Sequence, residues 1–170
     1  MTLRAQNCFL VALPMVLLLQ LSGCAWRNPA PAYTAERPSI NADVSTVGGR
    51  AAETATRLVG TPYRYGGTTP NGFDCSGLVY YSYQQAGQVV PRTSAAQFSS
   101  ANRISLKDAR PGDLLFFASR KSVDHVAIYL GDDMFVHAPS SGKRVSAGRI
   151  TDPYYRDHFV AAGRLVEGPE

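Results

Sequence analysis

The chain has 170 residues, of which 45% are hydrophobic and 18% are charged, enough for one well-buried domain and too few for two. Its formal net charge of +4 comes from scattered lysines and arginines, without a run of like charge or a basic helix. Nucleic-acid binding therefore lacks its usual electrostatic footprint, and the charge supports only a mild preference for anionic surroundings.

The first 23 residues have the composition of an export signal. Arg4 provides a short positive start, and an apolar run over residues 9–19 is too short to span a bilayer as a permanent helix. Leu-Ser-Gly at residues 21–23 then precedes Cys24. This pattern resembles a bacterial lipoprotein signal, in which Cys24 becomes the lipid-modified N-terminus once residues 1–23 are removed. An ordinary secretory signal is the alternative.

The three cysteines of the chain have separate expected fates. Cys8 leaves with the signal, Cys24 receives the lipid, and Cys75 remains as an unpaired thiol in an oxidising compartment. A lone cysteine of this kind is either small buried filler or a working group, so its neighbours have to decide.

Residues 24–46 contain three prolines and few large aliphatic side chains, which predicts a tether before a domain over residues 47–170. Helices are predicted first along that domain and strands afterwards, which indicates the α+β class. The expected helices cover residues 50–59, 75–85 and 94–101. The expected strands cover residues 113–119, 125–131, 134–139, 143–148 and 159–166.

Cys75 lies at the predicted start of the second helix, directly after Asp74. Aspartate is a strong N-cap, so the sulfur is expected in the first turn, where free N–H groups and the helix dipole favour an anion. We therefore expect the pKa of this thiol to be lowered and the thiolate to be reactive. The alternative is that Cys75 only packs the helix start as a small apolar residue.

Candidate bases for such a thiol are the three histidines of the chain. His125 and His137 lie in two consecutive predicted strands, whereas His158 lies near the end of the chain and has no partner in the pattern. Each histidine alone is most simply a half-buried strand residue. Two on one face would supply a base and a polar group that orients it, as a thiol-protease-like site requires.

The pairing of the two strands decides whether both imidazoles meet. With residues 131–133 as a three-residue hairpin loop, Leu130 pairs with Met134, and His137 becomes the diagonal neighbour of His125 on the same face. A register shifted by one residue would place the two histidines on opposite faces. The first pairing is the one that we predict.

Five segments then occur in series: GTPYRYGG, GFDCSGLVYY, VPRTSAAQF, RPGDLLFF and DHVAIYLGDDMFVHAPSSG. In this order and spacing they resemble the NlpC family of bacterial cell-wall cysteine peptidases, over roughly residues 47–166. The arrangement of a lipoprotein signal before a single domain is similar to that of small murein endopeptidase lipoproteins. The resemblance implies a papain-like α+β fold, in which the cysteine helix packs against a small antiparallel sheet. It also implies hydrolysis of peptidoglycan stem peptides, commonly next to meso-diaminopimelate.

By this resemblance, Cys75 corresponds to the nucleophile, His125 to the general base and acid, and His137 to the polar residue that holds the base in its tautomer. Tyr63 corresponds to the family's active-site tyrosine, whose hydroxyl would help the backbone N–H of Cys75 to hold the oxyanion. The alternative for Tyr63 is an aromatic side chain that only packs its loop.

The same resemblance includes polar residues with simpler explanations. Capping and local hydrogen bonds are enough to explain Asp74 and Ser76, and we interpret Asp113 as a turn and strand-start residue. Arg64 and Arg92 lie in the matching segments and are candidates to bind the free carboxylates of stem peptides. Solvated surface arginine is the alternative for both.

The expected reaction is acyl transfer through a thioester, without a metal or an organic cofactor. The expected partners are stem peptides and, through the lipid, a membrane. Ala25 after Cys24, with no aspartate there, resembles lipoproteins sent to the outer membrane, facing the periplasm. Two other classes stay open. They are a zinc site built from Cys75, His125 and His137, and a lipid-anchored cell-wall scaffold or regulator with an idle peptidase fold.

Overall fold

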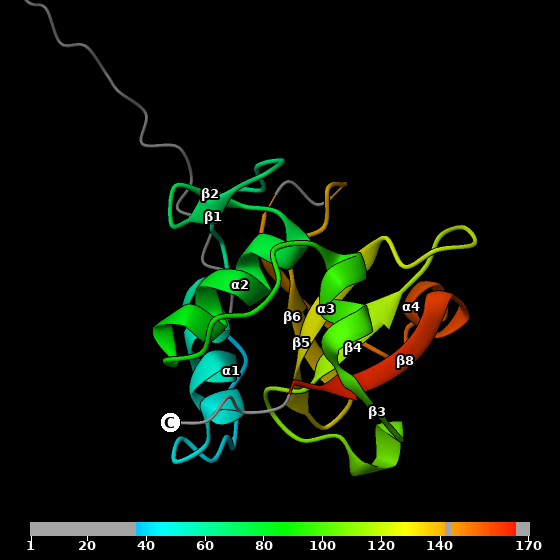
Figure 1. The fold of residues 1–170 in the computed structure, drawn as a ribbon, viewed down its shortest axis with the longest axis horizontal. Coiled ribbons are helices and arrows are strands. Elements are labelled where there is room, and N and C mark those ends of the chain that lie inside the picture. Colours follow the sequence, from blue (N-terminus) through cyan, green and yellow to red (C-terminus); the bar gives the residue numbers. More distant parts are fainter. Residues whose placement is uncertain (1–36, 142–143, 166–170) are drawn as a thin grey trace, which may run out of the picture. The chain divides into compact units, whose positions relative to one another are not determined.

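The computed structural model describes residues 37–141 and 144–165 (Figure 1). The expected signal over residues 1–23, the lipidation site Cys24 and the tether up to residue 36 lie outside the described residues. Within the described ranges, no helix is long and apolar enough to cross a membrane.

Helices and antiparallel strands together confirm the α+β class. The helices of the described part are α1 (Val47–Arg57), α2 (Cys75–Gln85), α3 (Ser94–Ser100) and α4 (Pro153–His158), with a 3₁₀ turn η1 (Leu106–Asp108). The strands are β1 (Thr68–Thr69), β2 (Gly72–Phe73), β3 (Asn102–Ile104), β4 (Leu114–Phe117), β5 (His125–Gly131), β6 (Met134–His137), β7 (Ser146–Arg149) and β8 (Phe159–Arg164). The sequence did not indicate α4 or the short strands β1, β2 and β3.

The main sheet is antiparallel, with the strand order β3-β8-β4-β5-β6-β7, and β1 pairs separately with β2. α1 and α2 pack against each other and against β5 (Figure 1). Side chains alternate along β5: Val126, Ile128 and Leu130 join the core under these helices, whereas Ala127 and Tyr129 face the other side. The cysteine helix thus packs on an antiparallel sheet, as expected for a papain-like fold.

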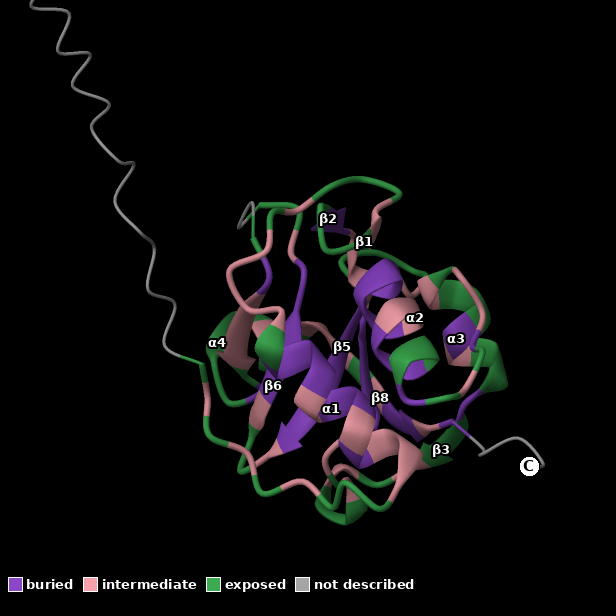
Figure 2. Cartoon of the chain, turned by 90° about the vertical axis from the view of Figure 1, so that its left-hand side faces the viewer, coloured by how far each residue is buried: buried purple, intermediate pink, exposed green. Residues whose placement is uncertain are grey.

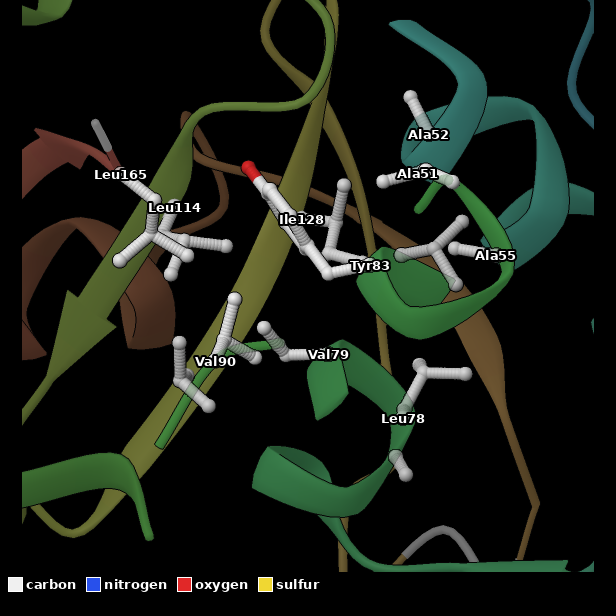
Figure 3. Packing of buried hydrophobic residues seen from close by; sticks show 14 of the residues in the cluster. Ala51, Ala52, Ala55, Leu78, Val79, Tyr83, Val90, Leu114, Ile128 and Leu165 are labelled. Atoms are coloured by element: carbon white, nitrogen blue, oxygen red, sulfur yellow. The ribbon is translucent and has the colours of Figure 1, made fainter. Parts of the chain in front are cut away.

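The main core lies between the two helices and the sheet, where α1 and α2 carry buried residues (Figure 2). Small side chains allow α1 to approach α2 closely, because Ala51, Ala52 and Ala55 are fully buried in the contact (Figure 3). Leu78 of α2 and Ile128 of β5 fill the space beside them. This packing sets where the first turn of α2 meets the sheet.

α4 covers the opposite face of the sheet with an aromatic cluster. The Tyr155 ring packs edge-on against Phe117 and Phe135, with centroids 5.7 and 4.8 Å away. His125 contacts the Phe117 ring at 5.9 Å, and His137 contacts the Phe135 ring at 5.1 Å. The two histidines therefore join this second cluster.

The β5–β6 hairpin differs from the expected one at its tip. Gly131 pairs with Met134, so the loop consists only of residues 132–133, both with positive φ. The predicted pairing of Leu130 with Met134 is therefore wrong, because a bulge shifts the register near the turn. The bulge absorbs one residue, so the pairs farther from the turn are those of the predicted register.

Asp113, interpreted from the sequence as a strand-start residue, is buried with 4% of its surface exposed. Its carboxylate accepts hydrogen bonds from Arg164 Nε and Nη2, both at 2.7 Å, and from the Arg110 N–H at 2.8 Å. We expect Asp113→Ala to lower the free energy of unfolding by about 2–4 kcal/mol in urea denaturation, because these donors lose their acceptor. Asp157→Ala removes an exposed partner of Arg156 and should cost less than about 0.5 kcal/mol. Equal losses in the two variants would contradict a structural role for Asp113.

Candidate active site

The N-terminus of α2 is built around Asp74. Its carboxylate accepts the Gly77 N–H at 2.7 Å, as an N-cap does, and the Gly66 N–H of the preceding loop at 2.9 Å. Gly77 allows that loop to lie on the helix, because a Cβ there would be 1.9 Å from the Gly67 carbonyl oxygen. The predicted cap and helix bounds are confirmed, and Cys75 is the first residue of α2.

Arg92 holds this cap from outside the helix. Its Nη1 and Nη2 donate to the two Asp74 carboxylate oxygens at 3.0 and 2.6 Å, and Nη1 also donates to Ser76 Oγ at 2.9 Å. Gln97 of α3 donates to the Ser76 carbonyl oxygen at 3.0 Å. Of the two arginines suggested for substrate carboxylates, Arg92 is thus engaged within the protein, whereas Arg64 is exposed.

The Cys75 thiol is free and half-buried, and it packs against the core that Val126 of β5 joins. Burial raises the pKa of the thiol, and the Val126 N–H opposes that rise. The Asp74 charge raises the pKa further, whereas the backbone N–H groups of the helix start lower it. The net direction is upward, so the expectation of a lowered thiol pKa is wrong for this structure.

His125 and His137 meet on the β5–β6 hairpin, as their predicted shared face requires. His125 Nε2 and His137 Nδ1 are 2.8 Å apart, within hydrogen-bond distance. Burial lowers the pKa of His125 to about 4, against the opposing charge of Asp124. Burial and the neighbouring His125 lower the pKa of His137 to about 3. Both imidazoles are therefore neutral at pH 7.

Tyr155 extends this pair and was missed by the sequence reasoning. Its hydroxyl lies 3.2 Å from His137 Nε2, the ring nitrogen that His125 does not contact. Asp152 before Pro153 is a helix-start signal that could have located α4. No local signal indicates that this helix folds back onto β6.

Tyr63 lies near the thiol, as the resemblance implied. Burial raises the pKa of its phenol, and the neighbouring Cys75 and Asp74 side chains add to that rise. Its backbone bridges to Phe73, two residues before Cys75. The structure thus brings Tyr63 and Cys75 together, and the phenol is partly buried.

A pocket of about 330 Å³ adjoins the histidine pair, lined by both imidazoles and by residues of α4. His158 lines it too, but its ring stacks on Tyr154 with centroids 4.3 Å apart. His158 Nδ1 is 2.7 Å from the Tyr154 carbonyl oxygen. His158 is therefore tied to its own helix and is separate from the His125–His137 pair.

The zinc alternative finds no support in this geometry. His125 and His137 point facing nitrogens at each other, and zinc would need lone pairs that converge with the thiolate on one point. Across residues 37–141 and 144–165, no group of three His, Cys, Asp or Glu side chains could hold a metal ion. The arrangement suits a hydrogen bond between the two imidazoles.

A thiol at a helix start and a pair of hydrogen-bonded imidazoles are groups that cysteine-dependent hydrolases use. The chain belongs to the NlpC/P60 family, whose model matches residues 60–164. The resemblance predicted from the five segments is thus confirmed.

Three relatives illustrate the match. The chain is 41% identical over 114 residues to probable endopeptidase YafL of Escherichia coli, which covers 64% of the chain and 46% of that protein. It is 37% identical over 114 residues to murein DD-endopeptidase MepH of the same organism, with 64% and 42% covered. A Staphylococcus aureus crystal structure described as similar to lipoprotein, NLP/P60 family, matches with a TM-score of 0.67 at 33% identity. That match covers 79% of the chain and 46% of the other protein, so the chain spans less than half the length of these relatives.

Proposed function

We propose that the protein is a cysteine endopeptidase that cleaves amide bonds in peptidoglycan stem peptides or in their crosslinks. The observation that carries this proposal is the junction of α2 and β5. There Cys75, the first residue of α2, packs against the core that Val126 of β5 joins, and His125, the residue before Val126, is paired with His137 at 2.8 Å. Relatives named as endopeptidases support the same reaction class.

In the proposed mechanism, His125 takes the thiol proton while Cys75 Sγ attacks the scissile carbonyl. His125 then gives that proton to the departing amine, which leaves a thioester on Cys75. Water, deprotonated by His125, attacks the thioester and releases the acid product and the thiol. His137 orients His125, while Tyr63 and the Cys75 N–H stabilise the oxyanion.

The proposed target is an amide bond next to diaminopimelate. The relative named a murein DD-endopeptidase supports a crosslink as the target, and a bond within one stem is the other possibility. Stem peptides carry free carboxylates, and the positive net charge of the chain suits them. Exposed Arg64, in the loop before the nucleophile, is our candidate to bind one of these carboxylates.

We further propose that lipid on Cys24 anchors the protein to the outer membrane, facing the periplasm. The Leu-Ser-Gly-Cys pattern supports this proposal, as does the structural relative described as similar to lipoprotein. Mass spectrometry of the mature protein should find an acylated Cys24 as the first residue. An unmodified N-terminus at that position would contradict the anchor.

The endopeptidase proposal is tested by incubating the purified protein with peptidoglycan and identifying the released muropeptides by mass. Fragments with a newly formed peptide terminus next to diaminopimelate would support the proposal and identify the bond. An intact substrate, together with retained binding to peptidoglycan, would favour the scaffold alternative instead.

A further inference from the structure

Three side chains form a continuous polar chain behind the proposed nucleophile. His125 Nε2 contacts His137 Nδ1 at 2.8 Å, and His137 Nε2 contacts Tyr155 Oη at 3.2 Å. His137 is buried, with 2% of its surface exposed. Both of its ring nitrogens thus have one partner each, and those partners decide where its single N–H lies.

Two directions of hydrogen bonding satisfy this chain when both rings are neutral. In the first, His125 Nε2–H donates to His137 Nδ1, and His137 Nε2–H donates to the Tyr155 oxygen. In the second, the tyrosine donates and every bond reverses. Only the first leaves His125 Nδ1 without a proton, and Nδ1 is the nitrogen that His137 does not contact.

The reaction itself requires the first direction. Once His125 has taken the thiol proton, both of its nitrogens carry hydrogen, so Nε2–H has to donate to His137 Nδ1. His137 then has its own hydrogen on Nε2, which needs an acceptor because a buried N–H without a partner is costly. The Tyr155 oxygen is the acceptor that the structure provides.

We propose that Tyr155 is a positioning residue that accepts a hydrogen bond from His137 Nε2–H. It thereby holds His137 in the tautomer whose Nδ1 accepts from His125, and keeps His125 Nδ1 free to take the Cys75 proton. The catalytic role of His125 rests on the proposed function. The tautomer of His137 is independent of that function.

Other titratable groups around the hydrogen-bonded series His125–His137–Tyr155 come from the neighbouring elements. Asp124 precedes β5 and favours the protonated form of His125. Burial raises the pKa of the Tyr155 phenol, and Tyr154 of α4 and Asp152, the N-cap residue of α4, add to that rise. The phenol therefore stays protonated at neutral pH and keeps an oxygen lone pair for His137.

Nitrogen NMR of histidine-labelled protein reads the tautomer of each imidazole directly. The chain has three histidines, so few signals need to be assigned. In the native protein we expect Nε2–H at both His125 and His137 at neutral pH. In Tyr155→Phe we expect His137 to shift toward Nδ1–H. Tyr154→Phe, the same change at a neighbour with 61% exposure, should keep the native tautomers. Native tautomers in Tyr155→Phe, or Nδ1–H at His137 in the native protein, would overturn the proposal.

Kinetic measurements distinguish a positioning role of Tyr155 from a purely structural role in the fold. Tyr155→Phe should lower kcat about three- to tenfold with little change in KM, the scale of one lost hydrogen bond. In a His137→Gln background the same change should cost less than about twofold, because Tyr155 acts through His137. Equal losses in both backgrounds would overturn the proposal. An inactive native protein would instead refute the proposed function, and the NMR result would still decide the tautomer.

Discussion

Cys75→Ala is expected to abolish the release of muropeptides, with a loss of about 10⁴-fold or more. Without the sulfur no thioester forms, and the remaining groups can only bind and polarise the substrate. The fold should persist, because alanine replaces a small side chain at the helix start and leaves the Asp74 cap untouched. Quantitative mass spectrometry of digested peptidoglycan measures the loss, and thermal unfolding checks the fold.

Ser82→Ala is the matched control for this substitution. Ser82 is buried on the same helix, and its hydroxyl finds no hydrogen-bond partner in the described part of the chain. Its removal should leave cleavage within about twofold of native, because the lost group makes no bond. Cleavage that survives in Cys75→Ala, or that is lost equally in Ser82→Ala, would remove Cys75 from the role of nucleophile.

Local signals were sufficient to predict the parts of the site that one element builds. Asp74 is a cap by residue type, so the start of α2 followed from the sequence. Strand alternation placed His125 and His137 on one face, and this survived a wrong prediction at the hairpin tip. An error in the turn was harmless because the bulge restored the register.

Contacts between distant segments were beyond local reasoning. Arg92 reaches Asp74 across a loop, and Tyr155 reaches His137 from a helix that the sequence did not indicate. Nothing in the residues around Arg92 distinguishes an arginine that binds substrate from one that secures a cap. Such single polar contacts depend on the packing of whole elements, which only coordinates show.

The protonation state of the thiol shows the same limit in electrostatic form. The helix start lowers the pKa of Cys75, as its position predicted, but burial outweighs that effect. Burial also lowers the pKa of His125 to about 4. The resting pair is therefore a neutral thiol and a neutral imidazole, which makes proton transfer to His125 part of the attack on substrate.

His125→Ala is accordingly expected to lower turnover by about 10²–10⁴-fold, because the thiol loses the base that accepts its proton. Alkylation of Cys75 by iodoacetamide at neutral pH should slow as well. The raised pKa of the thiol leaves little thiolate, and the variant lacks the base that would take the thiol proton during the attack. Muropeptide release and the rate of alkylation, measured on the same samples, check both effects. An unchanged alkylation rate would show that His125 does not act on this sulfur.

Free imidazole should restore part of the activity of His125→Ala. Removal of the ring joins its space to the pocket of about 330 Å³ that His125 lines, so a small base can enter the place that the His125 ring occupied. The restored rate should rise with pH as imidazole loses its proton, because only the neutral form accepts the thiol hydrogen. His158→Ala opens the same pocket without touching the His125–His137 pair, and should keep native activity with no gain from imidazole. Loss of activity in His158→Ala with retention in His125→Ala would reverse the assignment of the base.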